Sequence, residues 1–282
     1  MAEDQPGQAT APARPEAVRW LRIYLAMVKA SWATALEYRA QIVIWLLSWL
    51  FPLIMMVVWL AVVAEVGPAA GWDQSDFVSY YVAAAIVNYL TVAWIVWDWD
   101  EDIRTGTMSI KLLKPVDPFH HYFTNQLGQK LFFAVFLLPV FIVVAWLVPA
   151  IHYPLTFARL AAVVLSVILG FGLNMAMGAA AAVLAFWTTQ AKNIEMLWTG
   201  VGQFLSGWIA PLPLFPAGFQ SIARVLPFRS SLGFPIELLM GRLTWPEIAF
   251  GFAVTIGWTL FFWAVYRLLW RLGLRRYEAV GA

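Results

Sequence analysis

The sequence contains no cysteine and little charge, since only 12% of its 282 residues are Asp, Glu, Lys or Arg. The missing thiols exclude disulfides, cysteine-ligated zinc or iron–sulfur sites, and thiol catalysis. In contrast, 62% of the residues are hydrophobic and the mean hydropathy is +0.74. A soluble domain of this size cannot bury so much apolar surface, and a disordered chain would not contain it. The composition therefore predicts an all-α integral membrane protein.

Several chemical motifs are also missing. No lysine is preceded by Gly and followed by Ser or Thr, so there is no P-loop, and ATP would need a site on another polypeptide. The basic residues are not clustered on a polar domain, so we expect no nucleic acid partner. The acidic run Asp98–Asp102 lacks the second acidic cluster that a membrane prenyltransferase uses to hold Mg²⁺. We therefore predict no catalytic site, no metal site and no cofactor bound by this chain.

Six apolar runs are long enough, or nearly so, to cross about 30 Å of hydrocarbon. They are residues 42–64, 77–97, 131–150, 160–187, 194–210 and 248–266. Residues 1–17 have the composition of a disordered tail. Residues 18–39 place Leu21, Leu25, Val28, Trp32 and Leu36 on one stripe, which predicts an amphipathic helix in the interface. The alternative is an extension of the first span that packs on other helices.

Local signals mark two helix starts. Thr244, Pro246 and Glu247 form a capping box with proline in the first turn, and Asp117 precedes Pro118 in the same manner. Basic residues indicate the orientation. With six spans, 14 of the 18 Lys and Arg fall on the side of the membrane that holds the N-terminus, and 4 fall on the opposite side. This bias predicts that both termini are cytoplasmic in a multi-pass protein.

Residues 98–130 form a predicted polar segment that is too long for a turn between two spans. It mixes acids, bases, Gly and Pro with the apolar pair Leu112 and Leu113. Such a segment suits the docking of a soluble partner, and the alternative is a solvated loop.

Polar residues inside the predicted spans are candidates for function, because they are costly there. Two of them lie seven residues apart in the second run, and one lies between two glycines in the fourth run. The others lie on or beside one face of the fifth run. The candidates for a substrate pathway are Tyr81, Asn88, Asn174, Thr199, Gln203 and Ser206. Packing and hydrogen bonding between helices explain the same pattern equally well.

Residues 204–241 are apolar yet interrupted by five prolines, at positions 211, 213, 216, 227 and 235. An uninterrupted span is incompatible with this spacing. We predict short helices over 211–241 that re-enter the outer leaflet, and the alternative is an extracellular loop without insertion.

Two motifs in this order resemble the permeases of ABC-2 type transporters. The first is Leu-Leu-Lys-Pro-Val-Asp-Pro at 112–118, preceded by Arg104, Thr105 and Gly106. It is typical of an uncharacterised bacterial branch of that family. The second runs from Ser206 and Gly207 through Pro211, Leu212, Phe215, Pro216, Leu226, Pro227, Phe228 and Pro235 to Gly241.

The resemblance implies a transmembrane permease domain at 18–282 in the bacterial cytoplasmic membrane. Two permease subunits, identical or paralogous, would pair within the membrane lipid and be driven by two copies of a separate ATPase that binds ATP and Mg²⁺. The substrate would be lipid-like, amphipathic or drug-like and moved by export or translocation. The alternatives are an ATP-independent channel or secondary carrier, and a membrane-embedded enzyme.

The same resemblance assigns roles to two sets of residues. Coupling to the ATPase would involve Arg104, Thr105, Gly106, Leu112, Leu113, Lys114, Pro115 and Asp117. An outer gate would involve Pro211, Phe215, Pro216, Pro227 and Phe228.

Overall fold

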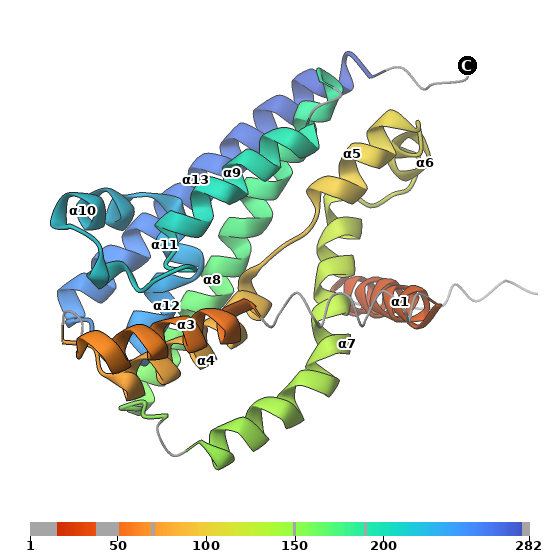
Figure 1. Cartoon of the computed structure of the whole chain (residues 1–282). Coiled ribbons are helices and arrows are strands. Elements are labelled where there is room, and N and C mark those ends of the chain that lie inside the picture. Colours follow the sequence, from red (N-terminus) through yellow and green to blue (C-terminus); the bar gives the residue numbers. More distant parts are fainter. Residues whose placement is uncertain (1–15, 38–50, 69–70, 149–150, 189–190, 278–282) are drawn as a thin grey trace, which may run out of the picture.

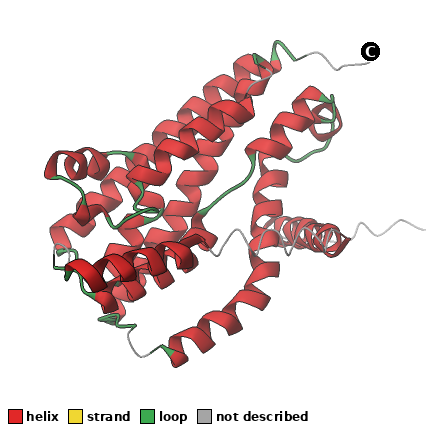
Figure 2. Ribbon diagram, in the orientation of Figure 1, coloured by secondary structure: helices red, strands yellow, loops and turns green. Residues whose placement is uncertain are grey.

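A computed structural model describes residues 16–37, 51–68, 71–148, 151–188 and 191–277. Within these ranges the chain folds into helices and connecting turns, without a β-strand (Figure 2). The helices are α1 (Glu16–Glu37), α3 (Phe51–Val66), α4 (Gln74–Thr91), α5 (Val96–Arg104), α6 (Met108–Leu112), α7 (Pro118–Leu147), α8 (Phe157–Ala182), η1 (Val183–Phe186), α9 (Ala191–Leu205), η2 (Leu212–Leu214), α10 (Ala217–Val225), α11 (Pro227–Ser231), α12 (Gly233–Leu239) and α13 (Trp245–Leu274).

Helices α8, α9 and α13 lie side by side as long rods, and α13 packs along most of α8 (Figure 1). Helices α3, α4 and α12 pack together at one end of these rods, while α5 and α6 lie towards the other end. Helix α7 diverges from the rods and contacts α1, which crosses it. The ends of the bundle are thus built from different parts of the chain.

Short-range caps set several helix starts, as predicted. The Asp117 carboxylate accepts a hydrogen bond from the backbone N–H of Phe119 at 2.9 Å, with Pro118 as the first residue of α7. At the start of α13 the backbone N–H of Thr244 donates to Glu247 at 2.9 Å. Both predicted helix starts are confirmed, because each depends on residues only two or three positions apart.

Four helical stretches in the described ranges are long and apolar enough to cross a membrane. They are Gln74–Arg104, Pro118–Val144, Phe157–Phe186 and Trp245–Leu274, which match the second, third, fourth and sixth predicted spans. Of the first predicted span, residues 42–50 lie outside the described residues, and α3 covers the rest. The fifth corresponds to α9, which has 15 residues, fewer than the roughly 20 that a perpendicular crossing needs.

The predicted loop at 98–130 is instead largely helical, and the helix that contains the third predicted span does not begin at residue 131. Helix α7 begins at Pro118, 13 residues earlier, so α5, α6 and the first half of α7 occupy most of this segment. Some polar side chains of that half are turned into the protein; for example, Gln126 is only 5% exposed and forms two hydrogen bonds with the backbone of Trp94. Lys130 therefore lies inside α7, and the predicted charge split becomes 13 to 4, which leaves the bias unchanged.

Helix α1 covers most of the predicted interfacial helix, of which residues 38 and 39 lie outside the described ranges. One face packs on α7, where the indole N–H of Trp32 donates to the carbonyl of Gly128 at 2.8 Å. Burial raises the pKa of the Tyr24 phenol, and its hydroxyl shares a hydrogen bond with His120 Nδ1 of α7 at 2.5 Å. Leu21 and Leu25 remain 60% and 52% exposed. Helix α1 thus combines packing on α7 with an apolar stripe left open to lipid.

Candidate functional site

The membrane-crossing stretch Gln74–Arg104 is interrupted between α4 and α5. Residues 92–95 are not helical, so backbone groups at the end of α4 lose their partners within the helix. Lys130 supplies a replacement from α7, because its Nζ donates to the carbonyls of Tyr89 and Val92, each at 2.7 Å. The ammonium group also offsets the negative end of the α4 dipole. A buried lysine inside a span is thus explained by the break that it faces.

Two amide side chains complete the support of the break. Gln126 of α7 accepts from the backbone N–H of Trp94 and donates to its carbonyl, both at 3.1 Å. Asn174 of α8 donates to the carbonyl of Thr91 at 2.8 Å. Irregular backbone at membrane depth is tolerated where protein groups satisfy it or where it lines a cavity. The break meets the first condition through α7 and α8.

Substituting Lys130→Met is expected to destabilise the protein, because it leaves two buried carbonyls without their charged donor. Hydrogen bonds to a charged group are each worth about 1.5–3 kcal/mol. We expect a lower thermal midpoint for the purified protein in nanodiscs. Lys29→Met, on the exposed side of α1, is the control and should leave the midpoint unchanged. Equal midpoints for the two variants would contradict the role of Lys130.

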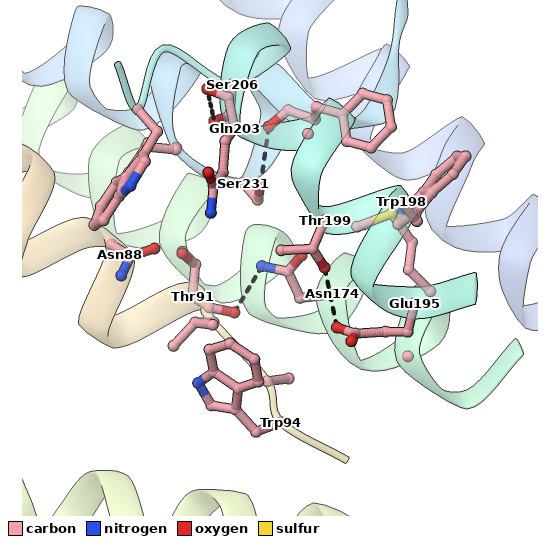
Figure 3. A pocket seen from close by; sticks show the side chains of 18 of the residues that line it. Asn88, Thr91, Trp94, Asn174, Glu195, Trp198, Thr199, Gln203, Ser206 and Ser231 are labelled. Atoms are coloured by element: carbon pink, nitrogen blue, oxygen red, sulfur yellow. Dashed lines mark hydrogen bonds between the residues drawn. The ribbon is translucent and has the colours of Figure 1, made fainter. Parts of the chain in front are cut away.

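The break opens onto a cavity of about 210 Å³ between α4, α8, α9 and α11 (Figure 3). Five of the six predicted pathway residues line it, although they come from three separate predicted spans. These five residues are Asn88, Asn174, Thr199, Gln203 and Ser206. Figure 3 shows Asn174 between Thr91 and Glu195, so the break and α9 face the same hollow. The structure therefore gathers residues that the sequence could place only on separate helix faces.

Tyr81 is the exception among the predicted pathway residues. It is fully buried, and its hydroxyl donates to the carbonyl of Ile209 at 2.7 Å. Its neighbour Tyr80 donates in the same way to Gly207 at 2.8 Å, and Gly207 has φ +92°. These two tyrosines hold the turn after α9 in place. Tyr81 is thus a structural contact next to the cavity and does not line it.

Phe228, predicted as a gate residue, lies on the cavity wall. It is 7% exposed, and its ring centroid is 4.6 Å from that of Trp198. Gly202 makes this contact possible, because a Cβ there would lie 2.9 Å from Phe228 Cδ1. Of the five predicted gate residues, Phe228 is therefore the one that lines this cavity with the predicted pathway residues.

The predicted coupling residues divide into two groups. Several have local structural roles: Arg104 pairs with Asp100 at 3.1 Å, Gly106 has φ +80°, and Asp117 caps α7. The hydroxyl of Thr105 donates to the carbonyl of Glu101 at 2.8 Å. The others project outward, and the exposed residues of this group are Leu112, Leu113, Lys114 and Pro115. The sequence could not separate the two groups.

Helix α6 and the residue that follows it expose apolar side chains, while other residues of α6 anchor it to the protein. Leu113 is 87% exposed and Leu112 37%, while Ile110, which the sequence did not single out, is 60% exposed. Met108 is fully buried, and Lys111 forms an ion pair with Asp102. An anchored helix with three exposed apolar residues matches the requirements of a docking surface.

Comparison with known proteins settles the family. The sequence model of the ABC-2 family transporter proteins matches residues 32–281, which is most of the chain. The chain belongs to this family. A search of curated proteins finds no match. As an ABC-2 transporter protein the chain is a membrane subunit rather than an enzyme, and its family works in partnership with an ATPase.

The proline-rich segment of this ABC-2 transporter protein forms the short helices η2, α10, α11 and α12. Pro216 precedes α10, and Pro227 begins α11, where its missing N–H is not needed. Helices α11 and α12 pack on α8 and are almost entirely buried, whereas α10 exposes Ile222 and Val225. Residues after Pro227 thus form part of the core.

A buried ion pair in the ABC-2 transporter protein was not predicted. Arg229 of α11 and Glu237 of α12 are each 8% exposed in their side chains, and Nη2 lies 2.6 Å from Oε2. A second bond joins Nε to Oε1 at 3.3 Å. The sequence feature that could have indicated this pair is one base and one acid, eight residues apart, in a largely apolar segment. The pair ties α11 to α12 directly behind the cavity wall.

Proposed function

We propose that this chain is the permease subunit of an ATP-driven transporter, and that the cavity beside the helix break lies on its substrate pathway. The observation that carries the proposal is the meeting of Asn88, Asn174, Thr199 and Gln203 around one hollow. Discontinuous helices beside a polar cavity are a recurrent arrangement in membrane transporters. Polar groups scattered for packing alone would not need to converge.

The proposal includes a separate ATPase, in two copies, and a second permease subunit, identical or paralogous. Helix α6 supports the docking of the ATPase, because Ile110, Leu112 and Leu113 are exposed at the end of the molecule where the basic residues of α13 also lie. ATP and Mg²⁺ would bind to the ATPase. The substrate class would be lipid-like, amphipathic or drug-like, in keeping with a hollow lined by both amides and aromatic rings.

Co-expression with candidate ATPases from neighbouring genes tests this function. We expect one ATPase to co-purify with the chain and to hydrolyse ATP faster in its presence. Substrate flux across vesicles without any ATPase would instead favour a channel or a secondary carrier. Failure of every P-loop partner to bind would contradict the assignment.

The proposed orientation places both termini in the cytoplasm of a bacterial cell and the segment 211–241 at the outer side. The absence of cysteine allows single cysteines to be introduced without removing any. In intact cells a membrane-impermeant thiol reagent should label a cysteine at Gly218, where an added Cβ would meet no other atom within 4 Å. It should fail to label one at Lys114. The reversed pattern would overturn the orientation.

The same labelling tests the gate. Phe228 is buried and Phe215 is half-buried, so cysteines there should react slowly at rest. If the segment moves during transport, both should react faster during ATP turnover. Equal rates in the two states would contradict a gate at these residues.

A further inference from the structure

The cavity beside the helix break contains a single ionisable side chain. Among the residues that line it, Glu195 is the one acid, and none is a Lys, Arg or His. The remaining polar lining consists of amide and hydroxyl groups, which are neutral. The charge character of the cavity is therefore set by one carboxylate on α9.

Glu195 has only a neutral partner nearby. The hydroxyl of Thr199, one turn further along α9, donates to its Oε1 at 3.0 Å. Across the described part of the chain, no ion pair reaches this carboxylate. A carboxylate with reduced access to water is costly without a counter-charge, so the site favours an arriving cation.

The two lysines nearest to this region are engaged elsewhere. Lys192, three residues before Glu195, lies 3.6 Å from Asp100 and 4.9 Å from the ring of Trp97. Lys130 is held by the carbonyls at the end of α4. Neither can neutralise Glu195 without giving up its own contacts.

Aromatic rings provide the other half of a cation site. Trp94, Trp198, Trp208 and Phe228 line the cavity together with Glu195. Trp94 and Trp198 are 38% and 40% exposed, so part of each indole is open to a ligand. Indole faces attract organic cations, and the attraction grows when the cation is desolvated. Figure 3 shows Trp94 and Glu195 on adjoining sides of the hollow.

We propose that this cavity binds an amphipathic organic monocation, such as a quaternary ammonium or phosphonium ion. Glu195 supplies the counter-charge, the indoles accept the apolar groups around the cationic centre, and Asn174 and Gln203 remain available to polar substituents. A role of this cation site in transport depends on the proposed permease function. The binding itself requires no ATPase, so it can fail or succeed independently of that function.

The test uses the purified full-length chain in nanodiscs and radiolabelled tetraphenylphosphonium. We expect saturable binding above that of empty nanodiscs. Glu195→Gln should weaken it by about tenfold or more, because the attraction between the carboxylate and the cation is lost. Glu195→Asp should retain most of the affinity, and Trp94→Leu should weaken it by a smaller factor. Tetraphenylborate, which has the same shape and the opposite charge, should not compete for the site.

Glu65→Gln is the matched control, because Glu65 is an exposed acid on α3 outside the cavity. It should bind tetraphenylphosphonium as the unmodified chain does. Unchanged binding in Glu195→Gln, effective competition by tetraphenylborate, or no saturable binding at all would each overturn the proposal. Because these measurements omit the ATPase, a negative result would leave ATPase co-purification as an independent test of the permease function.

Discussion

Replacing Leu112 and Leu113 together by Asp is expected to abolish the stimulation of ATP hydrolysis in the proposed ATPase partner. Both side chains are exposed, and Leu113 is 87% exposed, so a partner can cover them. Burying two leucines contributes roughly 3–6 kcal/mol before opposing costs, and two carboxylates would add a desolvation penalty. The measurement is the ATPase rate of the purified complex with and without the double variant.

The matched control is Leu112→Met with Leu113→Met, which keeps the apolar surface and should retain most of the stimulation. Helix α6 is anchored through Met108 and Lys111, so neither pair of substitutions should disturb membrane insertion. Full stimulation by a correctly inserted Asp variant would show that the ATPase docks elsewhere.

Arg229→Met is expected to be among the most destabilising single substitutions in the chain. It leaves the buried carboxylate of Glu237 without its partner at 2.6 Å. Removing one member of a buried ion pair typically costs about 3–5 kcal/mol. For a chain of this size we expect the thermal midpoint to fall on the order of 10 °C in nanodiscs.

The double variant Arg229→Met with Glu237→Gln separates charge burial from packing. It removes both charges at nearly constant volume, so it should recover most of the lost stability. If the double variant is as unstable as the sum of the single variants, the loss comes from packing. Arg229→Lys should fall between, because a lysine cannot form both bonds to the carboxylate.

Features that depend on neighbouring residues could be predicted from the sequence. The caps at Asp117 and Thr244 are examples, as is the apolar pair Leu112 and Leu113. The family could also be recognised from the sequence, and the family model confirms it. The all-helical membrane fold follows from composition and from the length of apolar runs.

The helical course of most of residues 98–130 and the break after α4 could not be predicted, because both depend on tertiary partners. Residues 92–95 contain neither Pro nor Gly, so no local signal marks a break there. The break is maintained by Gln126 and Lys130 from α7 and by Asn174 from α8. Those polar residues on α7 in turn made that part of the chain resemble a loop.

The candidate site was predicted as residues on helix faces and not as a site. Sequence spacing placed Asn88, Asn174 and Thr199 each on one face of its own helix. It could not show that these three helix faces meet around one cavity. Nor could it show that Tyr81, which satisfies the same spacing rule, turns towards the carbonyl of Ile209. Side-chain direction after packing decides between a pathway and a structural contact.

The interruption at residues 92–95 also divides one membrane-crossing stretch into two helices, α4 and α5, that pack against different neighbours. The rod α4 is held by α3, α8 and α12, whereas the rod α5, about 14 Å long, ends beside α6. Helix α5 also packs on α8, α9 and η1, two of which border the cavity. In the proposed transporter, a displacement of α6 by a docked ATPase would therefore pass through α5 to the cavity wall. Because α4 is not continuous with α5, the packing of α4 on α3 would not have to change in the same step.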